Sequence, residues 1–448
     1  MVICESMGKK PNIILVVFDT LRWDYFQKFL DEKSTSKEEL IGFLNFENAY
    51  SPSSWTLPSH FSLFTGLFPS EHGIHETPDS EMFEIFDKAL NYKGRFLSTL
   101  ASSYGYRTIG ITANPMLCDL TGFRDKFDEF YNINLGTLTG LDSGRDIKRK
   151  SKLRKFRYSI RMLIMLLRGF PKNKGYKVSS SLFKENNLQE PFFAFLNLME
   201  MHDPYFKTLF RTDDNKTMLN ALFKVNQLKK KKVNKLRQKY YIQEKKVLYT
   251  INETIKTLKE KNKFDDSIII ITSDHGQAID ECSYYGHGVF LYDELIHIPL
   301  LVKLPKGVNG KFDTKSYINL TDIYEFLSPF IKGDLKNCQF NFRDETFSEA
   351  FGIQYSKESV QKFLTDSSKL NIYKEINTSR KSVLKNGMKL TINSNSKVEE
   401  FKDTNNFESL EEKMTRLKDL ITLLEIFNID KDFLIDRDLI LRDFLTTS

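Results

Sequence analysis

The sequence predicts an α/β fold: a doubly wound, mostly parallel sheet with a small C-terminal α+β subdomain. Three apolar runs carry this prediction, at residues 13–18, 191–198 and 267–272. Each has the length and composition of a strand buried on both faces, which is typical of parallel sheets. Polar side chains follow the runs: Asp19, His202, and the pair Asp274 and His275. Ligand sites of open α/β sheets lie at the carboxyl ends of strands, so these side chains indicate a site.

Composition narrows the class of protein. The chain has 448 residues, enough for one large domain and a smaller one. Hydrophobic residues make up 40% and charged residues 28%, which excludes a disordered chain. The formal net charge of +7 fits an anionic substrate or surface and does not require nucleic acid. The four cysteines are scattered, so we expect neither a disulfide framework nor a structural zinc site.

The cellular location is predicted from two sequence patterns that we do not find, a signal peptide and a membrane-spanning helix. The first ten residues lack the apolar segment of a signal peptide. No run approaches the ~20 apolar residues of a membrane-spanning helix. We therefore expect a cytoplasmic protein.

The stretch 51–66, SPSSWTLPSHFSLFTG, predicts a loop that enters a short helix. Pro58 suits the first helical turn, and Gly66 suits the end of the helix. Thr56 lies at the junction and has two interpretations. It could cap the helix, since threonine is an ordinary N-cap residue. Its hydroxyl could also lie where the helix N-terminus favours an anion.

The next segments continue the α/β alternation and then interrupt it. Residues 93–104 predict a helix and 106–112 a strand that ends near Asn114. Residues 145–177 are basic and end in an apolar patch. This insertion could lie on an anionic membrane surface, or it could pack on the body with its charges solvated. Its aromatic residues are not spaced for base stacking, so we expect no nucleic-acid partner.

The remaining segments complete the predicted organisation. Residues 215–262 are lysine-rich and mostly helical, and 298–305 form a further strand. Beyond them, 381–392 predict a hairpin around an Asn-Gly turn, and 409–426 a periodic helix. We therefore expect a catalytic domain at 8–340 and a C-terminal subdomain at 341–448.

The residues at the strand ends favour metal chemistry. Asp19, Asp274 and His275 are suitable ligands of a divalent cation. Each alone could be a turn or core residue, but three such residues at like positions favour a metal site. Thr56 is a further expected metal ligand: coordination to the cation would lower the pKa of its hydroxyl, orient it and make it a nucleophile. Candidates for holding an anionic substrate or protonating its leaving group are Asn114, His202 and His287.

Five ordered motifs give the chain a family resemblance. They are PNIILVVFDTLRWD (11–24), WTLPSHFSLFTG (55–66), NLMEMHDPY (197–205), TSDHG (272–276), and YGHG with LYDELIHIP (285–288 and 291–299). In order and spacing they resemble the sulfatases of the alkaline phosphatase superfamily, over roughly residues 11–330. The resemblance implies a sulfatase-like fold with Asp19, Asp274 and His275 as metal ligands and Thr56 at the position of the nucleophile. It also places His202 and His287 near the anionic group of the substrate.

Departures from the family pattern concern the nucleophile. Sulfatases carry Cys or Ser in Cys-x-Pro-x-Arg and oxidise it to formylglycine, whereas this chain has Thr56, Pro58 and His60. Oxidation of threonine would give a ketone, so formylglycine cannot form. The family's Asp-Asp pair is Asp19–Thr20 here, and its Asp-Asn pair is Asp274–His275. With these changes the chain resembles relatives that use an unmodified threonine to attack phosphorus esters. We assign His60 to substrate binding, together with Asn114, His202 and His287.

The sequence therefore predicts a metal-dependent hydrolase or transferase of the sulfatase family, with phosphorus esters favoured over sulfate esters. A sulfuric ester hydrolase that works without formylglycine, and a non-catalytic protein that binds anions or glycans, stay open. We expect one or two divalent ions, Mn, Zn, Ca or Mg, of which a histidine ligand favours Mn or Zn over Ca. The expected substrate is an anionic ester, either a small molecule or linked to a glycan or lipid. Peripheral membrane contact through 145–177 stays open.

Overall fold

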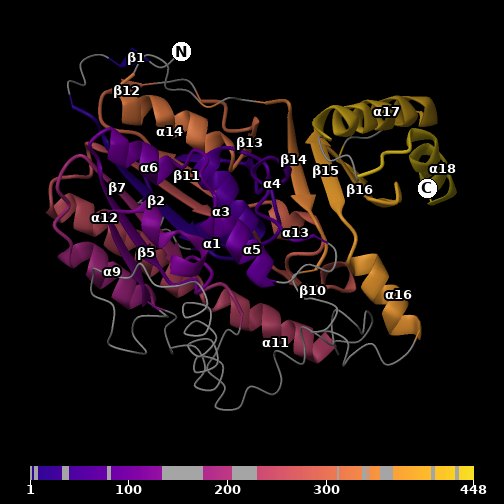
Figure 1. Cartoon of the computed structure of the whole chain (residues 1–448), viewed down its shortest axis with the longest axis horizontal. Coiled ribbons are helices and arrows are strands. Elements are labelled where there is room, and N and C mark those ends of the chain that lie inside the picture. The colour runs from indigo at the N-terminus through magenta and orange to yellow at the C-terminus, as the bar shows by residue number, and fades with distance from the viewer. Residues whose placement is uncertain are drawn as a thin grey trace.

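A seven-stranded sheet forms the centre of the computed structural model (Figure 1). The structure describes residues 3–4, 9–32, 40–77, 82–133, 175–203, 230–309, 312–334, 340, 343–353, 367–404, 409–428 and 433–447. The order of the strands is β3-β11-β8-β2-β7-β5-β6. Their bounds are β2 Asn12–Phe18, β3 Leu44–Phe46, β5 Arg107–Thr112, β6 Glu129–Asn132, β7 Phe192–Leu198, β8 Ser267–Ser273 and β11 Leu300–Lys303.

The strands are mostly parallel, as predicted. Four pairs of neighbouring strands are parallel: β8 with β2, β2 with β7, β7 with β5, and β5 with β6. Strand β11 runs antiparallel to both β8 and β3. The predicted strand at 298–305 is therefore present but shorter, and it reverses direction. This mixed edge is compatible with a doubly wound sheet.

Helices cover both faces of the sheet because alternate strand residues point to opposite sides. In β2, Ile13 and Leu15 pack into one core, with Phe61 and Leu63 of α3 and Ile323 of α14. Ile14 and Val16 pack into a second core, whose helical members come from α1, α9, α11 and α12. The bounds are α1 Trp23–Glu32, α3 Thr56–Thr65, α4 Pro69–His72, α5 Met82–Leu90, α6 Leu97–Ser103, α9 Tyr176–Glu185, α11 Lys230–Tyr241, α12 Glu244–Glu260, α13 Asp293–Ile296 and α14 Asp322–Lys332.

Short pairs of strands lie outside the central sheet. Their bounds are β1 Ile3–Cys4 with β12 Val308–Asn309, β4 Asn48–Tyr50 with β13 Tyr317–Asn319, and β9 Ala278–Ile279 with β10 Tyr285–Gly286. Three 3₁₀ turns complete the described elements of this part, at Asp119–Thr121, Arg124–Lys126 and Glu281–Ser283. In the described ranges, no helix is long and apolar enough to cross a membrane.

The C-terminal part forms a four-stranded antiparallel sheet with helices (Figure 1). Its elements are β14 Glu345–Ala350, β15 Arg380–Lys385, β16 Met388–Asn393, β17 Val398–Asp403, α16 Ser367–Ile376, α17 Leu410–Phe427 and α18 Arg437–Thr447. The predicted hairpin and helix are both present, and this part fits the small α+β subdomain. The boundary at 340 stays a prediction. Of the basic segment 145–177, all but its last three residues lie outside the described residues.

Strand β14 also touches the loop that precedes α3. The hydroxyl of Ser348 donates to the carbonyl of Ser51 over 2.7 Å, and both residues are fully buried. The carboxylate of Glu349 accepts from the backbone N–H of Ser70 and forms a buried ion pair with Lys381. The C-terminal subdomain therefore helps to hold the loop that leads to Thr56.

A second buried carboxylate in this region predicts a pH-dependent stability. Glu76 accepts hydrogen bonds from the indole of Trp55, at 2.6 Å, and from the backbone N–H of Phe351, at 3.3 Å. Burial raises the pKa of Glu76 from 4.5 to about 7. The folded protein therefore holds this proton more tightly than the unfolded chain does. The resulting stabilisation is complete below pH 4.5 and is lost as the pH rises to about 7.

We expect this loss to appear as a difference between the wild-type protein and Glu76→Gln, which cannot titrate at this position. From pH 4.5 to pH 7, the free energy of unfolding of the wild-type protein should fall by about 3 kcal/mol relative to Glu76→Gln. Urea unfolding of both proteins at several pH values measures this difference. If the difference in unfolding free energy between the two proteins does not change with pH, the raised pKa of Glu76 is contradicted.

Candidate active site

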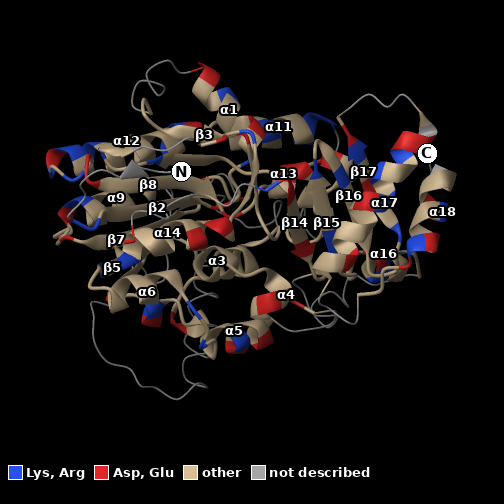
Figure 2. Ribbon diagram, turned by 90° about the horizontal axis from the view of Figure 1, so that it is seen from above, with Lys and Arg blue, Asp and Glu red and all other residues tan. Residues whose placement is uncertain are grey.

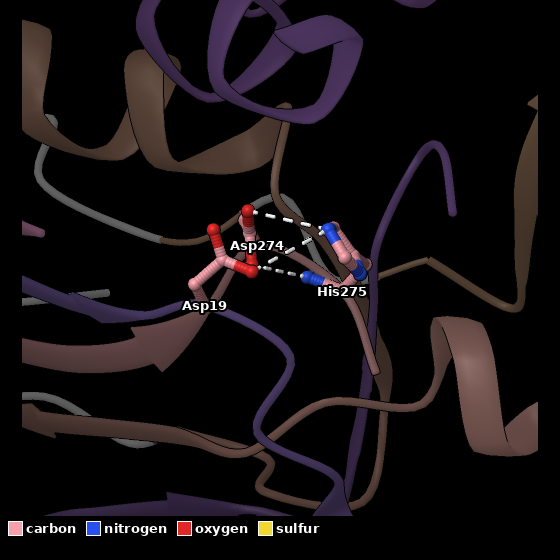
Figure 3. Close-up of side chains that lie close together, drawn as sticks. All are labelled: Asp19, Asp274 and His275. Atoms are coloured by element: carbon pink, nitrogen blue, oxygen red, sulfur yellow. Dashed lines mark hydrogen bonds and ion pairs between the residues drawn. The ribbon is translucent and has the colours of Figure 1, made fainter. Parts of the chain in front are cut away.

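Two neighbouring strands bring a group of metal-ligating side chains together. Asp19 follows β2, and Asp274 and His275 follow β8, which pairs in parallel with β2. All three side chains are fully buried. One ligand atom of each lies within 4.8 Å of those of the others, and the side chains point toward one another in Figure 3. The structure thus brings together the three residues that the sequence predicts as ligands.

The ring of His275 is oriented as a metal ligand. Its Nδ1 donates to the carbonyl of Gly276 over 2.8 Å, so Nδ1 carries the proton. Burial lowers the pKa of His275 to about 4, and the ring is neutral near pH 7. The lone pair of Nε2 therefore faces the carboxylates, 3.9 Å from Asp19 Oδ1 and 3.5 Å from Asp274 Oδ2. A histidine ligand needs this arrangement of its two nitrogens.

The two carboxylates also fit a bound cation. Asp19 Oδ1 and Asp274 Oδ2 are buried and accept no hydrogen bond from the described residues. Burial, followed by the charge of Asp19, raises the pKa of Asp274 well above its usual range. Within the described ranges, no lysine or arginine pairs with either carboxylate. A divalent cation would satisfy the free oxygens and offset the repulsion between the carboxylates.

Thr56 lies at the edge of this group. It is the first residue of α3, and Trp55 occupies the N-cap position without a side-chain cap bond. The interpretation of Thr56 as the helix cap is therefore wrong by one residue. Its hydroxyl lies 3.3 Å from Asp19 Oδ2 and 3.5 Å from His275 Nε2. The hydroxyl thus borders the metal-ligating atoms at the N-terminal end of a helix.

Asn114 joins Thr56 to Asp19. It follows β5, and its amide Nδ2 donates to Asp19 Oδ2 over 2.6 Å and to the Thr56 hydroxyl over 3.4 Å. Its own Oδ1 accepts from the backbone N–H of Met116 over 2.8 Å. The amide orientation is consistent with these contacts, because the accepting oxygen faces an N–H. Asn114 therefore lies within reach of any group bound at Thr56.

His60 lies behind the first turn of α3. Its Nδ1 donates to the carbonyl of Thr56 over 2.8 Å, and its Nε2 accepts from the amide of Asn197 over 3.2 Å. The side chain is fully buried, and burial lowers its pKa to about 4. Both ring nitrogens are thus engaged with protein groups. This geometry suits support of the Thr56 turn better than the predicted contact with substrate.

His287 lies next to His275, and His202 lies next to His287. The rings of His275 and His287 are 4.7 Å apart, and those of His287 and His202 are 5.0 Å apart. His287 Nδ1 lies 2.8 Å from Gln277 Oε1 and therefore donates to it. Its Nε2 then carries the lone pair. Burial lowers the pKa of His287 well below its usual range.

Sequence reasoning did not select Gln277, Asn197 or Ser51 as site residues. Each acts through a partner brought to it by the fold. Ser51 and Asn197 begin the stretches 51–66 and 197–205, but nothing in those stretches marks these two side chains as site residues. The Ser51 hydroxyl contacts the backbone carbonyl of Asp274 and the hydroxyl of Ser59. Gln277 directly follows the Asp-His-Gly motif, and this position is the one sequence feature that could have indicated it as a site residue.

The turn after β2 is held in an uncommon conformation. Thr20 has φ of 62°, a left-handed value that is rare for a β-branched residue. Its N–H donates to Asp274 Oδ1 over 3.2 Å, and its carbonyl accepts from the hydroxyl of Tyr240 over 2.7 Å. These contacts maintain the strain that directs Asp19 toward Asp274.

The fold is an α/β fold with a mostly parallel sheet, and the buried group of metal-ligating side chains lies at its carboxyl edge, where ligands bind in such sheets. The sulfatase family model matches residues 11–328 of the 448, so the chain belongs to the sulfatase family. This result confirms the family resemblance and the fold class predicted from the sequence.

Individual relatives are distant. An arylsulfatase of Clostridium perfringens is 22% identical over 370 residues, which cover 72% of this chain and 75% of the relative. The structure of a 2-O GAG sulfatase aligns with a TM-score of 0.62 at 14% identity, over 94% of this chain and 92% of that one. A phosphonate monoester hydrolase from Silicibacter pomeroyi gives a TM-score of 0.62 at 14% identity, over 94% and 96% of the two chains. At this identity the structural matches establish the fold alone.

Proposed function

We propose that the chain cleaves an anionic ester of phosphorus or sulfur, with Thr56 as the nucleophile and a divalent cation bound by Asp19, Asp274 and His275. One observation carries the proposal: the Thr56 hydroxyl lies within 3.5 Å of both Asp19 and His275. The hydroxyl and the ligands therefore share one small buried volume. A divalent cation bound there would lower the pKa of the hydroxyl and neutralise the charge that develops on the ester.

The other residues have supporting roles in this proposal. Asn114 positions Asp19 and the Thr56 hydroxyl. The first N–H groups of α3 point toward the same anion. His202 and His287 hold the ester group or exchange a proton with the leaving group. His60 supports the first turn of α3 in place of contacting the substrate.

The choice of ester follows from the nucleophile. Threonine cannot become formylglycine, so the Thr56 oxygen attacks the phosphorus or sulfur atom directly. The bond from that atom to the ester oxygen breaks, the alcohol leaves with a proton, and a covalent intermediate stays on Thr56. Water or an acceptor alcohol then releases it. Direct attack favours a phosphorus ester; the structural neighbours include both a phosphonate monoester hydrolase and a sulfatase. The sulfate ester is the second candidate, supported by the match to an arylsulfatase.

A glycan is the proposed carrier of the ester. One structural neighbour, at 14% identity, is a 2-O GAG sulfatase. Another, at 15% identity, is in complex with its substrate D-glucosamine-2-N,6-O-disulfate.

Turnover of a panel of nitrophenyl esters tests the proposal. The panel holds a phosphate monoester, a phosphate diester, a phosphonate monoester and a sulfate ester, each measured after chelation and after addition of manganese, zinc, calcium or magnesium. We expect turnover that depends on the added metal and that is faster for a phosphorus ester. Turnover of sulfate alone would favour the second candidate. Metal binding with no turnover of any ester would favour the non-catalytic alternative.

A further inference from the structure

Tyr240 connects helix α11 to the turn that follows Asp19. Its ring is fully buried and packs edge-on against the ring of Tyr25 in α1, with ring centroids 4.8 Å apart. Figure 2 shows α11 and α1 side by side, as this contact requires. The hydroxyl of Tyr240 donates to the carbonyl of Thr20 over 2.7 Å and accepts from the N–H of Arg22 over 2.9 Å. One side chain of α11 therefore bridges two backbone groups of this turn.

The turn needs such a hold because it contains a strained residue. Thr20 has φ of 62°, and the left-handed conformation is costly for a β-branched side chain. The N–H of Thr20 donates to Asp274 Oδ1 over 3.2 Å, so the turn also joins Asp19 to the second carboxylate of the site. A turn that relaxed out of the left-handed conformation would break this bond and move Asp19 relative to Asp274.

The Tyr240 hydroxyl is well suited to oppose this relaxation. In the described part of the chain, Tyr240 is the only residue that bonds the carbonyl of Thr20 or the N–H of Arg22, and both of these residues are buried. Without the hydroxyl, a buried acceptor and a buried donor would be left unpaired, which is costly. Burial raises the pKa of Tyr240 far above its usual range, so the hydroxyl keeps the proton that it donates to Thr20.

A second polar contact between α11 and this region is weaker. Arg237 donates to Glu281 Oε1 over 3.3 Å, and the side chain of Arg237 is exposed, where ion pairs contribute little. Glu281 Oε1 also accepts from Arg22 over 2.9 Å, a contact that does not involve α11. The hydroxyl of Tyr240 is therefore the stronger polar link between α11 and the site.

We propose that Tyr240 is a positioning residue whose hydroxyl sets the affinity of the site for a divalent cation. It holds Thr20 in the left-handed conformation and so keeps Asp19 facing Asp274 and His275 (Figure 3). Ligands that are already in place bind a metal more tightly than ligands that must first be ordered. This inference rests on the metal site of the proposed function and adds a residue outside the ligand set that determines how tightly the metal is bound.

Metal titration of the intact protein tests this inference. Manganese and zinc are titrated separately into chelated protein, and calorimetry measures the dissociation constant of each. Tyr240→Phe keeps the buried ring and removes only the hydroxyl. Tyr241→Phe is the matched control, because it removes the hydroxyl of the next residue in the same helix, which bonds Glu32. Thr20→Gly is combined with Tyr240→Phe, since glycine adopts the left-handed conformation without strain.

We expect Tyr240→Phe to bind the metal about tenfold more weakly than the wild-type protein, and Tyr241→Phe to bind within about twofold of it. The double variant with Thr20→Gly should return to within about threefold of the wild-type protein, because its turn no longer depends on the hydroxyl. A purely structural role of Tyr240 would lower the unfolding temperature and leave the dissociation constant unchanged. That result, equal weakening in Tyr241→Phe, or a double variant that binds no more tightly than Tyr240→Phe would overturn the inference.

The proposed function is judged separately, from turnover of the ester panel. A tenfold difference in metal affinity with no turnover of any ester would contradict the proposed function and support the role of Tyr240. Metal-dependent turnover with equal metal affinities would overturn the role of Tyr240 alone. A wild-type protein that binds neither manganese nor zinc would overturn both.

Discussion

Thr56→Ala should reduce turnover at least about 10⁴-fold, because it removes the proposed nucleophile. The folded structure should survive this change. Among the described residues, the hydroxyl makes only long contacts, 3.3 Å to Asp19 Oδ2, 3.4 Å from Asn114 Nδ2 and 3.5 Å to His275 Nε2. Steady-state kinetics on the most reactive ester of the panel measures the loss, and thermal unfolding checks that the variant is folded.

Two matched variants show whether the loss belongs to the hydroxyl of Thr56. Thr56→Ser keeps a hydroxyl at the same position and should retain turnover within about tenfold of the wild-type protein. Thr65→Ala removes a buried threonine hydroxyl from the last turn of the same helix, where it bonds the carbonyl of Phe61, and should leave turnover nearly unchanged. Full turnover by Thr56→Ala would show that another group attacks the ester.

Asp274→Asn should have opposite effects on stability with and without metal. In chelated protein we expect the variant to be more stable than the wild-type protein by about 1–3 kcal/mol, because it removes a buried charge that faces Asp19. An asparagine Oδ1 can still accept from the N–H groups of Thr20 and His275, as Asp274 Oδ1 does. Its Nδ2 would lie near the lone pair of His275 Nε2, which is 3.5 Å from the present oxygen.

Added metal should reverse this order. With free manganese or zinc at 100 times its dissociation constant, the wild-type protein should gain about 2.7 kcal/mol, and Asp274→Asn almost none. Asp280→Asn provides the control, because it makes the same charge change on a partly exposed residue nearby. Calorimetric unfolding with chelator and with metal measures all three proteins. A chelated Asp274→Asn less stable than the wild-type protein, or one that gains equally from metal, would contradict the metal site.

Much of this site could be predicted because the strands that carry it are strongly patterned. The apolar runs of β2 and β8 have no plausible alternative to buried strands, and parallel strands place the residues after them at one edge. This reasoning brought Asp19, Asp274 and His275 together without any structural information. The short helix at Thr56 was also predictable, because Pro58 and Gly66 mark its two ends.

Other features could not be predicted from local patterns. Strand β11 lies between β3 and β8 and runs antiparallel to both, and an apolar run carries no information on direction. The supporting contacts of His60 and His287 depend on Asn197 and Gln277, which are brought to them by the fold. Thr56 lies one position inside the helix because cap positions are set by backbone geometry and vary by a residue or two.

The covalent intermediate on Thr56 tests the central claim most directly. The protein is mixed with the most reactive ester, quenched in acid during turnover, digested and examined by mass spectrometry. We expect a phosphoryl or sulfuryl group on the peptide that contains Thr56, and no such label after Asp274→Asn or after chelation of the metal. A label on any other residue, or wild-type turnover by Thr56→Ala, would contradict the claim that Thr56 attacks the ester at the site formed with Asp19, Asp274 and His275.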